Sequence, residues 1–196
     1  SCPHDVIGYD HVQGGFKPFH IEDELGPDNC GHGEKGCTSC TRACPRFRTW
    51  EDEADEFLFD RTRTPEEPSG VYKDIILTRA SDDFIHEVGQ DGGLVSAILI
   101  WALDNGYIDA ALTSYVGEGE GSQWTASPGV AFNRDDVIRG AGSRYTYSAN
   151  TLAYSEAIEA GAKKIALVGM SCQSSILPVA KSRKIGKVGN RFALNI

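Results

Sequence analysis

The stretch GGLVSAILIWALDNGYIDAALTS, residues 92–114, decides the fold class. Its apolar run predicts a helix over 92–105 that is apolar on all sides and therefore buried. Asn105-Gly106 ends this helix, because both residues tolerate the left-handed turn that follows a helix. The next apolar run predicts a strand over 108–114. A buried helix followed closely by an apolar strand indicates an α/β protein.

The rest of the C-terminal part repeats this alternation. Short apolar runs predict strands over 75–78, 164–169 and 191–196, and residues 150–160 predict a helix that ends at Gly161. The Gly- and Ser-rich stretch 117–129 is expected to be a loop. We therefore expect a mixed sheet with flanking helices over residues 71–196. Because the last strand runs into Ile196, we expect this α/β domain to be incomplete at its C-terminal end.

Residues 1–70 have a different character. They are polar and rich in Gly, Pro and acidic residues, and they lack sustained periodicity, which predicts a small irregular domain. The chain of 196 residues has a formal net charge of -9, which argues against nucleic-acid binding. No apolar run is long enough for a transmembrane segment, and the start lacks the apolar core of an export signal. We expect a cytoplasmic protein.

Four cysteines in residues 30–44 indicate a metal centre, since disulfides are rare without export. The spacing Cys37-x2-Cys40-x3-Cys44-Pro matches the last three cysteines of the bacterial ferredoxin run. The first cysteine of that run would fall at Glu34, and we expect Cys30 to replace it. The segment is thus predicted to be ferredoxin-like and to bind a [4Fe-4S] cluster.

Two alternatives remain open at this centre. The same cysteines, with or without His32, could bind zinc, in which case the protein would be a zinc-stabilised binding or scaffold module without redox activity. Within the iron–sulfur interpretation, the four cysteines could share one cluster. Alternatively, Cys44 could join a second cluster with Cys172, because the cysteine before proline ligates the other cluster in two-cluster ferredoxins.

Three further segments are candidates for ligand binding. QDGG (90–93) precedes the buried helix, where backbone N–H groups can receive a phosphate, although close packing alone would also explain the glycines. RGAGSRYTYS (139–148) combines arginines suited to phosphate with aromatic rings, or is an ordinary surface loop. VGMSCQ (168–173) follows an apolar strand, so Cys172 lies where α/β sheets bind ligands, unless it is a buried structural cysteine.

Taken together, these segments resemble the coenzyme F420 hydrogenase/dehydrogenase beta-subunit family, which is also similar to the reductases of hydroxymethyl chlorophyll. The matching pieces are QDGGLVSA (90–97) with GYIDAA (106–111), then GSRY (142–145), then VGMSCQ (168–173). The usual V-G-x-P-C-Q pattern has Ser171 in place of proline here. The similarity covers residues 70–196, and the cysteines lie where such proteins often carry a ferredoxin-like insertion.

The resemblance implies an oxidoreductase with FAD and one or two [4Fe-4S] clusters, and with coenzyme F420 as a candidate substrate. It implies electron transfer between this small-molecule hydride carrier and a redox partner, either a ferredoxin or a hydrogenase or dehydrogenase subunit. Residues 71–196 would then be the flavin-binding domain, and Cys172 would be a cluster ligand. The implied cofactor-binding residues are Gln90, Gly92, Gly93, Ser96, Ser143, Arg144 and Tyr145.

Overall fold

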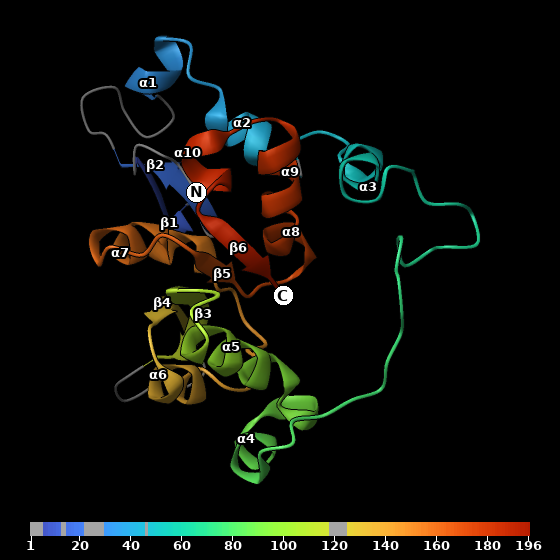
Figure 1. The fold of residues 1–196 in the computed structure, drawn as a ribbon. Helices are drawn as coiled ribbons and strands as arrows, with labels where there is room; N and C mark the ends of the chain where they lie inside the picture. Colours follow the sequence, from blue (N-terminus) through green and yellow to red (C-terminus); the bar gives the residue numbers. More distant parts are fainter. Residues whose placement is uncertain (1–5, 13–14, 22–29, 46, 118–124) are drawn as a thin grey trace.

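A four-stranded mixed sheet organises the C-terminal part of the chain in a computed structural model, which describes residues 6–12, 15–21, 30–45, 47–117 and 125–196 (Figure 1). The strand order is β4 (Ala126–Ala131), β3 (Ala110–Val116), β5 (Ile165–Leu167) and β6 (Phe192–Asn195). Strands β3, β5 and β6 run parallel, whereas β4 is antiparallel to β3. The predicted mixed α/β sheet is confirmed.

Helices cover both faces of this sheet (Figure 1). In β3, Ala110 and Leu112 belong to one buried cluster and Ala111 to another, so the strand is buried on both sides. Towards the first face lie η2 (Asn150–Ala153), α7 (Tyr154–Glu159), α9 (Ile176–Ser182) and α10 (Gly186–Gly189). Towards the second lie α4 (Asp83–Val88), α5 (Leu94–Asp104) and α6 (Arg134–Arg139).

Most predicted elements of this part form, with three corrections. Residues 126–129 were predicted as the end of a loop, but they belong to β4, an edge strand in which Pro128 needs no ladder partner on its open side. The remainder of that predicted loop falls partly on residues 118–124, outside the described residues. Helix α5 was predicted to be buried all round, whereas Val95, Ile98 and Trp101 leave one side exposed.

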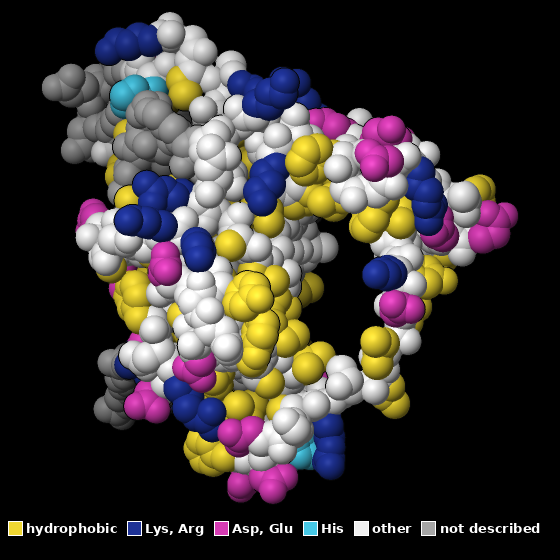
Figure 2. Space-filling view, in the orientation of Figure 1, with side chains coloured by type: hydrophobic (Ala, Val, Ile, Leu, Met, Phe, Trp, Pro, Cys, Tyr) yellow, Lys and Arg dark blue, Asp and Glu magenta, His cyan; other side chains and the backbone are white. Residues whose placement is uncertain are grey.

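The predicted strand over 75–78 is wrong. Residues 61–79, here called the arm, precede the α/β body, residues 80–196. The arm is an extended segment with open space beside it (Figure 2). Ile75, Ile76 and Leu77 are 81%, 74% and 102% exposed. A strand needs a neighbour to receive its backbone hydrogen bonds, and no described residue supplies one here.

The N-terminal region is more regular than predicted. Strands β1 (Ile7–Val12) and β2 (Gly15–His20) form an antiparallel pair. Three helices follow, α1 (Gly31–Glu34), α2 (Ser39–Ala43) and α3 (Glu51–Phe59). Residues 30–45, called the cysteine segment below, and α3 both pack against α9. Cys2 lies outside the described residues. No described helix has the length and apolarity needed to cross a bilayer.

Candidate functional site

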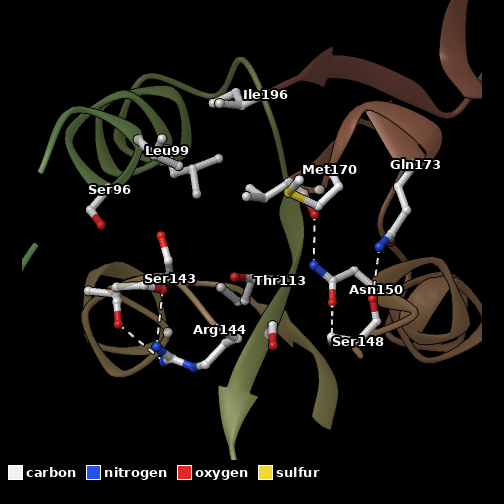
Figure 3. A pocket seen from close by; sticks show the side chains of 18 of the residues that line it. Ser96, Leu99, Thr113, Ser143, Arg144, Ser148, Asn150, Met170, Gln173 and Ile196 are labelled. Carbon is white, nitrogen blue, oxygen red and sulfur yellow. Dashed lines mark hydrogen bonds between the residues drawn. The ribbon is translucent and has the colours of Figure 1, made fainter. Parts of the chain in front are cut away.

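A cavity of about 810 Å³ opens at the carboxyl edge of the sheet (Figure 3). Its floor comes from the ends of the parallel strands, with Thr113 and Ser114 on β3, Val168 and Gly169 after β5, and Ile196 after β6. Open α/β sheets bind ligands at this edge, because the strands end there and the following loops diverge. The volume lies in the upper range of small-molecule pockets.

One wall joins two of the three predicted motifs. Gln90 lies in η1 (Gln90–Gly92), and its Oε1 accepts a hydrogen bond from the Ser143 backbone N–H at 2.8 Å. Its Nε2 donates to the Tyr145 hydroxyl, also at 2.8 Å. One amide side chain therefore ties the loop 142–145 to the turn that precedes α5.

The turn after Gln90 brings the start of α5 to the cavity. Gly93 has a φ of 69°, and a Cβ there would clash with the Ile85 carbonyl oxygen. This close approach explains the glycine, and no side chain caps the helix. The uncapped backbone N–H groups of the first turn, together with the 7%-exposed Ser96, lie at the cavity wall. A helix start of this kind favours an anionic group.

Arg144 is the single charged residue among the described residues that line this cavity. Its Nη1 and Nη2 donate to the carbonyl oxygens of Gly142 and Ala141 at 3.0 and 3.1 Å. The guanidinium fork thus holds its own loop, while its charge adds one positive group to the cavity wall. In a chain with a net charge of -9, a cavity without acidic side chains suits a neutral or anionic ligand.

The opposite wall is polar and internally bonded (Figure 3). The buried Asn150 donates to the Val168 carbonyl at 2.8 Å and accepts from the Ser148 hydroxyl. Gln173 donates to the Ser148 carbonyl at 2.8 Å, and its Oε1 is buried without a hydrogen-bond partner. Ser114 Oγ and Arg144 Nε are also buried without a hydrogen-bond partner. Unsatisfied buried polar atoms around one cavity fit a ligand with hydrogen-bonding groups of its own.

The cavity contains most of the cofactor residues that the sequence predicted. Gln90, Gly93, Ser96, Ser143 and Arg144 line it. Two others do not. Gly92 packs against Arg79 at the end of the arm, and Tyr145 is 90% exposed and reaches the wall only through Gln90.

Several lining residues were missed because they belong to no glycine-rich motif. Thr113 and Ser114 end a predicted strand, and the rule that ligands bind at strand ends could have found them. Asn150 begins a predicted helix, and nothing in the sequence indicated that its amide is buried. The principal polar residues that were missed are Thr113, Ser114 and Asn150, whereas Ser148 and Gln173 end two of the candidate segments.

Cys172 connects this cavity to a second one. Its side chain is exposed and lies in α8 (Ser171–Ser174), at the wall of the large cavity. Cys172 also lines a smaller cavity of about 350 Å³, together with Pro45, Trp50 and Glu51. The third predicted motif therefore separates the large cavity from the end of the cysteine segment.

The cysteine segment carries four cysteines that form no disulfide, Cys30, Cys37, Cys40 and Cys44. Cys30 caps α1 and accepts a hydrogen bond from the Gly33 N–H at 3.4 Å. The Cys44 N–H bonds to the Cys40 carbonyl at 3.0 Å, which places these two cysteines one helical turn apart. Cys37 precedes α2 and lies 3.6 Å from the Ser39 hydroxyl.

No group of three or more His, Cys, Asp or Glu side chains is arranged as a metal site within the described parts of the chain. The donor chemistry nevertheless fits a cluster, since the four cysteines form no disulfide and lie half-buried or exposed on short, glycine-containing turns.

Residues 75–154 match the family of the coenzyme F420 hydrogenase/dehydrogenase beta-subunit N-terminal region. The coenzyme F420 hydrogenase subunit beta of Methanothermobacter thermautotrophicus is 34% identical over 119 residues, which cover 60% of this chain and 41% of that protein. The coenzyme F420-dependent sulfite reductase of Methanocaldococcus jannaschii is 32% identical over 151 residues, or 70% of this chain and 23% of that protein. The chain thus matches less than half the length of these relatives.

A solved structure shows a similarity to the same group of proteins. A chain of the F420-reducing [NiFe] hydrogenase complex from Methanosarcina barkeri, studied by xenon derivatization, superposes with a TM-score of 0.54 at 29% sequence identity. The match covers 60% of this chain and 40% of that one. Residues 75–154, which build much of the large cavity, are therefore the part of this chain that belongs to the coenzyme F420 hydrogenase/dehydrogenase beta-subunit family.

Proposed function

We propose that this chain is part of an FAD- and [4Fe-4S]-dependent oxidoreductase that transfers electrons between coenzyme F420, or a similar hydride carrier, and iron–sulfur partners. The observation that carries the proposal is the position of Cys172. This thiol lines both the large cavity and the small cavity at the end of the cysteine segment. Cys172 would therefore lie on the path of an electron that passes from a ligand in the large cavity to Cys44.

The large cavity suits a flavin nucleotide. The start of α5 at Gly93 and Ser96 would receive a phosphate, with Arg144 supplying positive charge nearby. Gln90 and the Ser143 N–H already form a fixed polar edge on the same wall. Tyr145 would act through Gln90, and Gly92 would shape the turn without contacting the cofactor.

The cysteines suit iron–sulfur clusters. Pro45, which directly follows Cys44, and Cys172 face the same small cavity, which favours the arrangement in which Cys44 and Cys172 serve one cluster. Cys30, Cys37 and Cys40 would then belong to a second one. When bound, a flavin would accept the two electrons of a hydride and release them singly to the clusters.

The names of the relatives support the choice of carrier and partner. They include F420 hydrogenase beta subunits and an F420-dependent sulfite reductase. We therefore expect this chain to work with another subunit or a redox partner protein, of hydrogenase, dehydrogenase or ferredoxin type.

Anaerobic purification of the protein tests this proposal. We expect bound FAD, iron and acid-labile sulfide, and rapid bleaching of the flavin absorbance by reduced coenzyme F420 in a stopped-flow experiment. Arg144→Gln should weaken FAD binding about tenfold through the lost charge–ligand interaction. The control Arg134→Gln should leave binding unchanged, because Arg134 pairs with Asp82 on the surface.

Two results would contradict parts of the proposal. A colourless protein with one zinc per chain would identify a zinc-stabilised module instead. If flavin and iron are present but reduced F420 does not bleach the flavin, the choice of carrier is wrong, and reduced ferredoxin becomes the next donor to assay.

A further inference from the structure

The cysteine segment is attached to the α/β body mainly by polar contacts. Of its described residues, Ala43 alone joins the buried cluster beneath α9. The flanking helix α3 packs against α9 but leaves Phe57, Leu58 and Phe59 exposed. Because little apolar area is buried here, hydrogen bonds and ion pairs must determine where this segment lies.

Arg183, directly after α9, makes most of these contacts. Its Nε and Nη2 donate to the Glu53 carboxylate, with closest distances of 3.0 and 2.9 Å. Its Nη1 donates to the Arg42 carbonyl at 2.7 Å, and Nη2 also reaches the Thr49 carbonyl at 3.4 Å. The Arg42 side chain donates in return to the Arg183 carbonyl. The Arg183 side chain is only 11% exposed.

These contacts bracket the residues that face Cys172. Pro45, Trp50 and Glu51 line one side of the small cavity, and Ser171 and Cys172 line the other. Arg183 binds the chain before this stretch, at Arg42, and after it, at Glu53. A single guanidinium therefore fixes the cavity wall that begins at Pro45, next to Cys44, relative to the wall that carries Cys172.

The contacts made by residue 183 require the side chain of arginine. A planar guanidinium can bind a carboxylate with two parallel N–H groups and still donate to carbonyl oxygens. A lysine ammonium is a point charge that cannot hold Glu53, Arg42 and Thr49 together in this geometry. Glu53 is the matching partner, and it also accepts from the Ser182 hydroxyl at 2.8 Å.

We propose that Arg183 is a positioning residue that clamps the cysteine segment against Cys172 and thereby sets the rate of electron transfer between the two cofactor sites. Electron transfer depends steeply on the distance between centres, so a loosened clamp would slow it without changing either cofactor. The part that concerns the rate rests on the proposed function, whereas the clamp itself can be tested on the chain without cofactors.

The first test uses the chain without cofactors. A short bismaleimide should cross-link Cys44 to Cys172 in the original protein, as mapped by mass spectrometry. In Arg183→Lys the yield of this cross-link should fall, and amide exchange over residues 39–45 and 47–59 should accelerate about tenfold, the effect of losing bonds to a charged group. Glu53→Gln should act in the same direction while Arg183 stays in place. Arg134→Lys, which alters a surface ion pair remote from this contact, is the matched control.

The second test uses the protein loaded with flavin and iron. In Arg183→Lys the reduction of the flavin by a hydride donor should keep its rate, while the following reduction of the cluster should slow about tenfold, as expected for a small misplacement of reacting groups. Unchanged cross-linking and exchange in both variants would overturn the clamp. Unchanged cluster reduction despite weaker cross-linking would overturn its role in the rate. If the original protein binds no flavin or iron but the variants lose the cross-link, the proposed function fails and the clamp stands.

Discussion

The α/β body, residues 80–196, and the region of residues 30–79 are ordered by different interactions. Among the described residues, nearly all buried apolar side chains belong to the body, and residues 30–79 contribute only Ala43 and Ala54 to the buried hydrophobic set. In place of a core, the second region has ion pairs such as Arg63–Asp55 at 2.6 Å and Arg61–Glu67 at 2.6 Å. Apolar burial places the elements of the body, whereas polar contacts place the cysteine segment and the arm.

This difference predicts where substitutions matter. In the body, removing apolar volume should unfold the protein and empty the large cavity. In residues 30–79, exposed apolar side chains should be replaceable, and charges should control local order. Exposed ion pairs stabilise proteins only modestly, so effects in this region should be smaller and more sensitive to pH.

Phe192→Ala should have the largest effect. Phe192 is 2% exposed, and its ring centre lies 5.7 Å from that of Tyr154. Loss of this ring should lower the free energy of unfolding by about 3 to 5 kcal/mol. The counterpart Leu77→Ala, in the exposed arm, should change it by less than about 0.5 kcal/mol. Denaturant titration measures both, and equal losses would refute the division into two regions.

Gly93→Ala should come next. A Cβ at Gly93 would meet the Ile85 carbonyl and displace the turn that carries the start of α5. This change should lower the free energy of unfolding by about 3 kcal/mol. Gly106 has nearly the same φ, 67° against 69°, but open space around it. Gly106→Ala should therefore lower the free energy of unfolding only by the backbone strain of a non-glycine residue at positive φ, about 1 kcal/mol. FAD retention and thermal unfolding should separate the two variants, and similar losses would show that the close approach is unimportant.

Gln90→Ala should affect the ligand more than the fold. It removes both hydrogen bonds that hold the loop 142–145, and we expect FAD affinity to fall by up to about thirtyfold, since each such bond contributes about 1 kcal/mol. Asn105→Ala removes a comparable surface hydrogen bond at the other end of α5 and should leave affinity unchanged. Fluorescence titration measures the FAD affinity of each variant. Equal affinities for both variants would show that Gln90 does not contribute to FAD binding.

Acidification should have the mildest effect, and in the second region we expect it at Glu53. The Arg183 guanidinium lowers the pKa of the Glu53 carboxyl below its ordinary value of 4.5. Because the pKa in the folded state is depressed, this contribution is complete above pH 4.5 and is lost as the pH falls through the folded value. Amide exchange over residues 47–59 should accelerate in that window, and Glu53→Gln should reduce the change. The remainder belongs to Asp55, whose pKa the Arg63 guanidinium also lowers. An undiminished pH response in Glu53→Gln would assign all of it to other groups.

The sequence predicted the body better than the region before it, for a physical reason. Apolar periodicity reports burial, so it found α5, β3, β5 and β6. The same periodicity failed at Ile75, Ile76 and Leu77, which have strand-forming side chains but no neighbouring strand among the described residues. It also missed β4, where Pro128 and Gly129 resemble a turn, although Gly129 provides room for the Tyr115 ring.

The site was predicted through its motifs and missed where it depends on the fold. Three segments far apart in sequence meet at one cavity, as their resemblance to the family implied. The buried amide of Asn150 and the strand ends at Thr113 and Ser114 became visible only with the sheet order. The contact of Arg183 with Glu53 joins residues far apart in the chain, and no local pattern could indicate it.

The position of Cys172 between the two cavities is the central claim, and counting iron and flavin per chain in anaerobically purified Cys172→Ser tests it most directly. Serine keeps the size of the side chain but is not the thiolate that a cluster needs. We predict that the iron content falls while the FAD content is unchanged, and that Cys44→Ser shows the same loss. Full iron content in Cys172→Ser, with loss only in Cys44→Ser, would contradict the account and assign a single cluster to Cys30, Cys37, Cys40 and Cys44.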